Sequence, residues 1–308
     1  TVDIGISSAR ANWSGSSFAI YSNHDDALSN SNATAWYHDY ATATLMDTGD
    51  LNGDDVEDLV LLYPAWEAFG CVPSFGNSAS AKGLGFAPEF LLVDDFDADG
   101  FDDVLVTQQN GTNISIYFGS LSAPGSFPSI SQFAAGATIS DIAVGDLNND
   151  SSPDLVVATD DGRLDIFFNT QNEVPFDGFY ELNPTPLAKI WSVVVGDFNS
   201  DGLDDLAYPR SPQSIDILLQ RASEPYFTLP ADLTLRITFG GDFTALWSGE
   251  ITGDNRTDIA AMRPSDPDVY FFDQDDFEGA AHPYASLTLP ELPGFVSLTD
   301  VTDDGHAD

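Results

Sequence analysis

Basic residues are scarce in this chain of 308 residues. Nine lysine and arginine residues stand against 50 aspartate and glutamate residues, which gives a formal net charge of -41. A protein that binds the phosphate backbone of nucleic acids, or an anionic membrane surface, needs positive charge on its own surface. The composition therefore excludes nucleic acid as a main partner.

Cysteine and long apolar runs are also lacking. Cys71 is the only cysteine, so no disulfide can form within the chain, and we interpret Cys71 as a small buried apolar residue. No run of 18 or more apolar residues is present, which excludes a membrane-spanning helix. No signal peptide stands at Thr1, and we therefore expect a soluble chain that has already been processed.

The acidic residues follow a repeat. A nine-residue segment with side-chain oxygens at positions one, three, five and nine occurs six times, and its first positions lie 45, 51, 51, 53 and 50 residues apart. Such a period predicts one structural unit per repeat. We call these segments loops one to six, and they are Asp50–Asp58, Asp95–Asp103, Asp146–Asp154, Asp197–Asp205, Glu250–Asp258 and Asp300–Asp308.

Short apolar runs flank the loops and predict β-strands. The runs before the loops are Ala43–Met46, Phe90–Val93, Ile139–Val144, Trp191–Val195, Thr244–Trp247 and Phe295–Leu298. The runs directly after the loops are Leu59–Tyr63, Val104–Thr107, Leu155–Thr159, Leu206–Tyr208 and Ile259–Met262. A third run often follows, as in Ile114–Phe118, Leu164–Phe168, Ile215–Leu219 and Val269–Phe272.

A unit of roughly 50 residues with three visible strands and room for a fourth predicts one blade of a β-propeller. A parallel β-helix has a shorter period, and an array of βαβ units needs helical periodicity that the sequence lacks. We therefore predict an all-β fold, with residues 1–308 forming a single propeller domain of four-stranded blades.

The start of the chain fits the same repeat, because Asp3 aligns with position nine of the loops. Thr1–Ser7 would then supply the strand that should follow Asp308, and the ring would close with six blades. The alternative is that the chain is part of a seven-bladed ring.

Each loop offers a cage of oxygen ligands, because alternate residues of a tight loop can point toward one centre. With a backbone carbonyl at position seven, this is the hard and flexible coordination that Ca²⁺ prefers, whereas zinc would require His or Cys. We predict about one calcium ion per loop and up to six in total. The candidate ligands at positions one, three, five, seven and nine are Asp50, Asn52, Asp54, Val56, Asp58; Asp95, Asp97, Asp99, Phe101, Asp103; Asp146, Asn148, Asp150, Ser152, Asp154; Asp197, Asn199, Asp201, Leu203, Asp205; Glu250, Thr252, Asp254, Arg256, Asp258; and Asp300, Thr302, Asp304, His306, Asp308.

The loops are not equally well formed. Position six needs a sharp turn, which Gly100 and Gly202 supply more easily than Ser151 does. Glu250 and Thr252 replace the usual residues of loop five, and we expect the lowest calcium affinity there. The alternative is that the loops are ordinary Asp-rich turns. Turn chemistry alone does not demand the same four oxygen positions in six copies, which favours calcium.

The loop openings carry a family resemblance. Gly-Asp-Leu-Asn or Gly-Asp-Phe-Asn begins at Gly49, Gly145 and Gly196, and Phe118-Gly119 adds a Phe-Gly pair after a third strand. These motifs resemble the FG-GAP/VCBS repeats of integrin α-chain propellers and of many secreted bacterial proteins, over nearly the whole chain. The resemblance implies a calcium-binding propeller outside the cell, used in adhesion, in carbohydrate binding or as an accessory domain.

Other candidate sites give weaker signals. His24, Tyr37 and His38 form the one cluster that an enzyme could use, although no catalytic spacing is recognisable. Trp191 and Trp247 lie in leading runs and are expected in the core. Trp13, Trp36 and Trp66 are candidates for exposed rings that stack on sugars. Six Asn-x-Ser/Thr triplets begin at Asn12, Asn32, Asn110, Asn113, Asn149 and Asn255, and we discount Asn149 and Asn255 as glycosylation acceptors because they lie within the loops.

These observations predict a secreted or cell-surface calcium-dependent binding module for a glycan or an extracellular protein. One alternative is a structural subunit that self-associates into an extracellular filament. The second alternative is an enzyme that degrades polysaccharides.

Overall fold

A computed structural model describes the backbone of three N-terminal strands and most residues between 43 and 288. Among the described residues, no helix has the length and apolar character that a membrane span requires. The chain forms two compact units: unit one is Thr1–Gln109 with Ile114–Gln132, and unit two is Asn110–Asn113 with Phe133–Asp308. The described residues are 3–5, 17–21, 35–38, 43–54, 58–72, 80–120, 127–170, 176, 179–184, 189–211, 214–237, 243–252, 256–264, 268–273, 278–281, 283 and 285–288.

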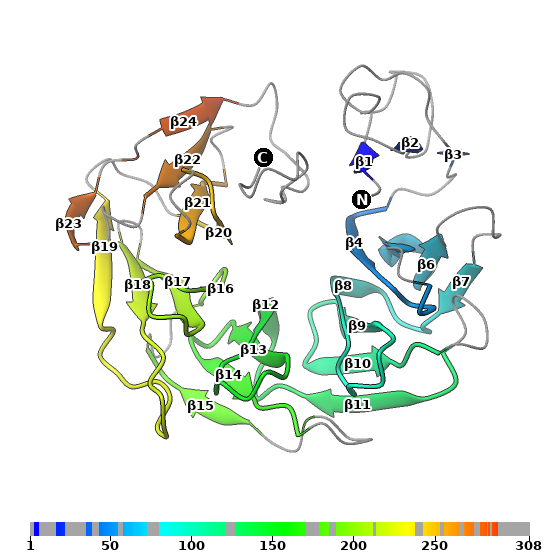
Figure 1. Cartoon of the computed structure of the whole chain (residues 1–308), viewed down its shortest axis with the longest axis horizontal. Helices are drawn as coiled ribbons and strands as arrows, with labels where there is room; N and C mark the ends of the chain where they lie inside the picture. Colours follow the sequence, from blue (N-terminus) through cyan, green and yellow to red (C-terminus); the bar gives the residue numbers. More distant parts are fainter. Residues whose placement is uncertain are drawn as a thin grey trace. The chain divides into compact units, whose positions relative to one another are not determined.

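Three sheets make up most of unit one, and the strands of each pair in sequence order (Figure 1). The sheets are β1-β2-β3, β4-β5-β6-β7 and β8-β9-β10-β11. Their strands are β1 (Asp3–Gly5), β2 (Ser17–Tyr21), β3 (Ala35–His38), β4 (Leu45–Gly49), β5 (Asp58–Tyr63), β6 (Ala68–Val72), β7 (Ser80–Gly83), β8 (Pro88–Asp94), β9 (Asp103–Gln108), β10 (Asn113–Tyr117) and β11 (Ile130–Ala134), with the 3-10 helix η1 (Pro64–Trp66) between β5 and β6.

Unit two contains three further sheets, in the orders β12-β13-β14-β15, β16-β17-β18-β19-β23 and β20-β21-β22-β24. Strand β23 is an addition to the second of them, because it lies beside β19 and pairs with it in parallel (Figure 1). The strands are β12 (Ile139–Gly145), β13 (Asp154–Thr159), β14 (Leu164–Phe167), β15 (Tyr180–Leu182), β16 (Val194–Gly196), β17 (Asp205–Ser211), β18 (Ser214–Leu218), β19 (Leu233–Ile237), β20 (Ala245–Gly249), β21 (Asp258–Met262), β22 (Asp268–Phe272), β23 (Glu278–Ala281) and β24 (Ala285–Thr288).

The predicted all-β propeller of four-stranded blades is confirmed, but the predicted number of blades is not. The described residues form five four-stranded blades, and not six. We number them blades one to five, which are β4–β7, β8–β11, β12–β15, β16–β19, and β20–β22 with β24. The sheet that would make a sixth blade has three strands, and loop six lies outside the described residues.

The three-stranded sheet has the connectivity of an incomplete blade. Position nine is the first residue of the second strand in each blade, as Asp58 is in β5 and Asp103 is in β9. Asp3 is likewise the first residue of β1. Strands β1, β2 and β3 therefore correspond to the second, third and fourth strands of a blade, in agreement with the alignment of Asp3 with position nine.

The core lies between neighbouring blades of each unit and is built from the second and third strands. All residues of β5 and β13 are buried, whereas the outer strand β7 alternates between partly buried and exposed residues. Position two of the loops adds apolar anchors to this core, because Leu51, Phe96 and Leu147 are each at most 1% exposed. The loops are thus anchored at position two to the packed interior. Burial of these apolar side chains stabilises the fold.

Candidate metal centre

The same hydrogen bonds shape loops two, three and four. In loop two the position-one carboxylate, Asp95, accepts the N–H groups of Asp99 (3.1 Å) and Gly100 (2.9 Å). Asp99 in turn accepts the N–H group of Phe101 at 3.0 Å. Loops three and four repeat these contacts through Asp146 and Asp197. The backbone is therefore folded around the carboxylates at positions one and five.

Two residues of each of these loops have left-handed backbone conformations. The prediction for position six is confirmed, since φ is 87° at Gly100, 68° at Ser151 and 82° at Gly202. Position four shares this conformation, as Ala98 (φ 58°) and Asn149 (φ 62°) show, and the sequence did not indicate it. Such angles cost about 1 kcal/mol or more for residues with a Cβ atom.

Three acidic side chains come together in loop two. Asp95, Asp97 and Asp99 each place one carboxylate oxygen within 4.8 Å of the other two. This spacing is short enough for three oxygens to contact one Ca²⁺ ion at about 2.3–2.6 Å. The predicted ligands at positions one, three and five are thus brought together in this loop.

An independent feature supports a cation at position three. Asp97 Oδ1, Asn148 Oδ1 and Thr252 Oγ1, which occupy this position in loops two, three and five, are buried and have no hydrogen-bond partner in the protein. An unpaired buried oxygen is destabilising, by about 1–3 kcal/mol. Because the same position is affected in three loops, the arrangement fits a bound cation, and oxygen ligands without His or Cys fit calcium.

Position three differs in loops one and four. Asn52 Nδ2 donates a hydrogen bond to Asp58 Oδ2 at 2.8 Å, and Asn199 Nδ2 donates to Asp201 Oδ2 at 3.0 Å. In loop four, Asn199 Oδ1 also accepts the N–H group of Asp201 at 2.9 Å. Binding of calcium in these two loops would require the amide oxygens to turn toward the ion.

The position-nine carboxylates have a structural role of their own. Asp103 accepts the N–H groups of Phe96 (3.0 Å) and Gly119 (2.8 Å), so it joins its loop to the end of β10. Asp154 and Asp205 make the corresponding contacts in loops three and four. Each carboxylate oxygen has a second lone pair, so an oxygen that accepts one of these hydrogen bonds can also coordinate a metal ion.

Burial strongly affects the acidity of these groups. Burial raises the pKa of Asp103 to about 8, and the nearby carboxylates of Asp97 and Asp95 raise the same pKa. Burial also raises the pKa values of Asp154 and Asp205 to about 7. A bound cation would favour the ionised carboxylates and would offset this effect.

Position eight also has a structural role, which was not predicted from the sequence. Asp102 Oδ2 accepts the N–H group of Asp50 at 2.7 Å, and Asp204 Oδ2 accepts that of Asp146 at 2.8 Å. Each pair joins the loops of two neighbouring blades. The first pair lies in unit one and the second pair lies in unit two. The signal in the sequence was an aspartate directly before position nine in loops two and four.

Packing explains why a glycine stands at the start of the loop openings. A Cβ atom at Gly49 would collide with Val93 and with the carboxylate of Asp102. A Cβ atom at Gly145 would collide in the same way with Val195 and Asp204. The glycine therefore permits the close approach of the neighbouring blade, and of its position-eight carboxylate.

Several predicted ligands stay untested. Val56, Asp254 and all of loop six, with Asp300, Thr302, Asp304, His306 and Asp308, lie outside the described residues. Phe101, Leu203 and Arg256 occupy position seven, where the backbone carbonyl was the expected ligand. Their side chains need no role at the metal.

One prediction about the tryptophans was wrong. Trp191 is 49% exposed, because the preceding residue, Ile190, is the one that enters the core, and Lys189 Nζ lies 4.0 Å from the Trp191 ring centroid. Trp66 is 56% exposed, as expected. Cys71 is buried as predicted, and burial raises its pKa to about 12.

The histidine cluster stays a prediction. His24 lies outside the described residues, and for Tyr37 and His38 in β3 the structure describes the backbone alone.

One solved structure supports this fold. The structure of BBS1N in complex with ARL6DN, soaked with mercury, is similar with a TM-score of 0.54 and 15% identity, over 81% of this chain and 70% of that chain. A second structure, BBS1N in complex with ARL6DN soaked with lead, has a TM-score of 0.46 and 15% identity, over 80% of this chain and 81% of that one. No curated protein matches the chain in sequence.

A family model matches part of the chain. Residues 95–157 and 146–208 each match the FG-GAP-like repeat, and these two segments contain loops two, three and four with the strands around them. Residues 95–208 therefore carry FG-GAP-like repeats, within a propeller of four-stranded blades.

Proposed function

We propose that the chain is an extracellular, calcium-dependent binding module whose partner is a protein. The observation that carries the calcium dependence is the buried, unpaired oxygen at position three of loops two, three and five. Extracellular calcium modules have dissociation constants of about 10⁻⁴–10⁻³ M. Loop five, in which Thr252 takes the place of an Asp or Asn ligand, is compatible with that range.

A protein partner is supported by three features. The chain carries FG-GAP-like repeats, and the similar BBS1N structure is a complex with another protein, ARL6DN. The net charge of -41 favours partners with basic surfaces. Complementary charge between partners accelerates their association and suppresses binding to acidic competitors.

An array experiment tests both parts of the proposal. Labelled protein is applied to immobilised extracellular proteins and to glycans, in calcium and in EDTA. We expect a protein to retain the wild type in calcium, and retention to be lost in EDTA and to be weakened in the Asp97→Ala variant. Asp160→Asn, which removes an exposed carboxylate outside the loops, is the matched control. Retention that is the same in EDTA as in calcium, or retention by glycans alone, would contradict the proposal.

A role in an assembly is the second candidate, and the three-stranded sheet favours it. Among the described residues β1 pairs with β2 alone, so one edge of β1 can accept a further strand. A strand from another copy would give a heterologous contact and, if the contacts do not close, a filament. Deletion of Thr1–Ser7 should then abolish filaments in negative-stain images. A lower melting temperature with no change in assembly would instead indicate pairing within one chain.

A further inference from the structure

A pocket in unit two lies between blades three and four, on the side of the calcium loops. It has a volume of about 370 Å³ and is lined by Phe168, Tyr180, Glu224, Pro225 and Tyr226. Phe168 follows β14, and Tyr180 is the first residue of β15. The other three residues belong to the segment between β18 and β19. The volume lies within the range of small-ligand sites, near its lower end.

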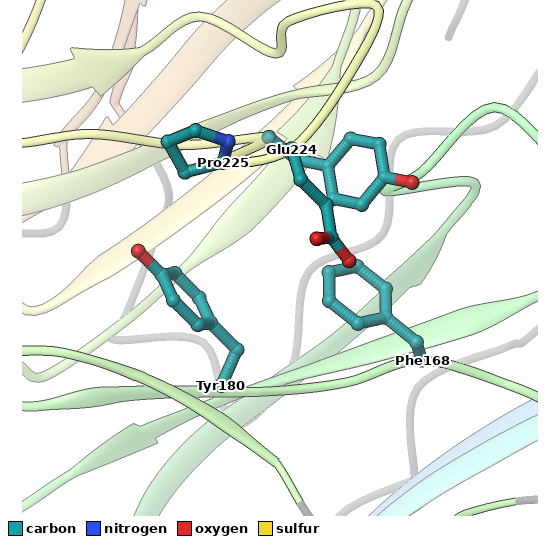
Figure 2. Close-up of a pocket in the computed structure, with 5 residues that line it drawn as sticks. Phe168, Tyr180, Glu224 and Pro225 are labelled. Atoms are coloured by element: carbon teal, nitrogen blue, oxygen red, sulfur yellow. The ribbon is translucent and has the colours of Figure 1, made fainter.

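The pocket has aromatic walls and one carboxylate. The rings of Phe168 and Tyr226 pack edge to face, with centroids 5.3 Å apart. Figure 2 shows the carboxylate of Glu224 directed toward the ring of Phe168, with the Tyr180 ring on the other side of the pocket. Among the residues that the structure describes, no lysine or arginine lines the pocket, and Arg221 of the same segment donates to Asp232 at 3.2 Å.

Both walls are attached to calcium loops. Asn169, the neighbour of Phe168, donates its N–H group to the position-nine carboxylate Asp154 at 2.7 Å. On the other wall, Gln220 donates its N–H group to the position-nine carboxylate Asp205 at 2.8 Å. The next residue, Arg221, closes the segment with a 2.8 Å bond from its N–H group to the carbonyl of Tyr226. Loops three and four therefore hold the two sides of the pocket in place.

The chemistry of the lining selects a cation. Aromatic faces attract ammonium and guanidinium groups, and a carboxylate pairs with them. The chain already uses such contacts, since Lys189 Nζ lies over the ring of Trp191 and Arg263 lies 4.5 Å from the ring centroid of Tyr270. A neutral sugar would need several polar groups for its hydroxyls, whereas this pocket offers one carboxylate and two phenols.

We propose that this pocket binds the lysine or arginine side chain of a protein partner. The proposal rests on the function proposed above and specifies where, and through which group, a partner is held. The net charge of -41 concentrates basic segments near the surface, and the pocket then selects a single cationic side chain.

The test is a titration of the calcium-loaded protein, followed by the NMR signals of its aromatic rings. The probes are N-acetyl-lysine methylamide and N-acetyl-arginine methylamide, with the uncharged norleucine analogue as the control ligand. We expect saturable shifts with one or both cationic probes and none with norleucine. Binding of the norleucine analogue with equal affinity would overturn the proposal, as would tighter binding of a methyl glycoside.

Variants of the pocket sharpen the test. Glu224→Gln keeps the shape of the side chain and should weaken binding of the cationic probe about tenfold, while Tyr180→Ala removes a ring and should weaken it to a similar extent. Tyr180→Phe keeps the ring and should stay within about twofold of the wild type, as should Asp160→Asn, which removes an exposed charge elsewhere. Unchanged binding in Glu224→Gln would refute the role of the carboxylate.

The two proposals can fail separately. If the array identifies a calcium-dependent protein partner and Glu224→Gln binds it as tightly as the wild type does, the pocket inference is wrong and the proposed function stands. If the cationic probes bind and no protein is retained on the array, the pocket inference stands and the proposed function is wrong.

Discussion

Asp50 and Asp102 bind each other twice across two neighbouring blades. The N–H group of Asp50 donates to Asp102 Oδ2 at 2.7 Å, and the N–H group of Asp102 donates to the carbonyl of Asp50 at 3.1 Å. Burial raises the pKa of Asp102, while the hydrogen bond from Asp50 lowers it. Position one of loop one is thus held by position eight of loop two, which connects two predicted calcium sites.

Removal of this acceptor should destabilise the protein. In Asp102→Ala the N–H group of Asp50 loses its partner, and we expect a loss of about 1–3 kcal/mol in the free energy of unfolding, measured in urea. Asp102→Asn keeps a side-chain oxygen and should lose less. Asp204→Ala, which removes the equivalent acceptor of Asp146 in unit two, should behave like Asp102→Ala. Equal stabilities for the Ala and Asn variants would show that the hydrogen bond contributes nothing.

The predicted calcium loops should differ in calcium affinity. Asp99→Ala and Asp201→Ala remove a position-five carboxylate from loops that contain three or more acidic side chains. Thr252→Ala changes loop five, which has three acidic side chains, Glu250, Asp254 and Asp258, and keeps all of them in this variant. At calcium a hundredfold above the dissociation constant, loss of a site lowers stability by about 2.7 kcal/mol. Calorimetry in calcium should therefore show larger losses for the first two variants.

The same variants in EDTA are the control for this prediction. Asp99 and Asp201 also accept loop hydrogen bonds, so part of their effect is independent of metal. The calcium-dependent part is the difference between the two conditions. An equal difference for all three variants would contradict the ranking.

The left-handed backbone at position six predicts opposite effects on stability for two substitutions, one that removes a glycine and one that introduces a glycine. Ser151 has φ of 68° at position six, where Gly202 has φ of 82° in the next loop. Gly202→Ala should destabilise by about 1 kcal/mol, and strain of the backbone is the only cause because a Cβ atom there meets nothing within 4 Å. Ser151→Gly should raise stability by up to about 1 kcal/mol. Urea unfolding of both variants checks the prediction, and a destabilised Ser151→Gly would refute it.

Stability of the calcium-free protein should fall as the pH rises. Burial raises the pKa of Asp103 to about 8 and those of Asp154 and Asp205 to about 7, above the value near 4 of an unfolded chain. The folded state therefore holds more protons than the unfolded state between about pH 4 and pH 8. This stabilisation is complete below about pH 4 and is lost as the pH rises through the folded pKa values.

Calcium should reverse that trend, because its binding requires ionised carboxylates. The difference in melting temperature between calcium and EDTA should be larger at pH 8 than at pH 5. High salt screens the surface charges more than the buried ones, so the pH dependence in EDTA should persist when salt is added. A calcium effect that is the same at both pH values would contradict this explanation.

The strands next to the loops were predictable, and the outer strands were not. The second strand starts at position nine in every blade, and runs such as Leu155–Thr159 are continuous apolar segments because both of their faces are buried. The fourth strands gave no such signal. In β7 and β11 polar residues such as Lys82 and Gln132 flank or separate the apolar ones, so neither strand contains a continuous apolar run.

Contacts between distant segments also could not be read from the sequence. The carboxylate of Asp102 was indistinguishable from a solvated loop residue until the structure placed it on Asp50. The pocket joins residues that are more than 40 positions apart, Phe168 and Glu224, and no local pattern marks it. The predicted number of blades was wrong for a similar reason. The alignment of Asp3 indicated which strand of a blade β1 is, but it did not indicate which segment pairs with β1.

Thermal unfolding in calcium and in EDTA tests the central claim, that the loops are calcium sites which stabilise the blades. Several carboxylates within about 4 Å repel one another by several kcal/mol per loop unless a cation is present, and each saturated site adds about 2.7 kcal/mol at a hundredfold excess of calcium over its dissociation constant. The account predicts a much higher melting temperature in calcium. The same melting temperature in calcium and in EDTA would contradict it and would show that the loops are ordinary turns.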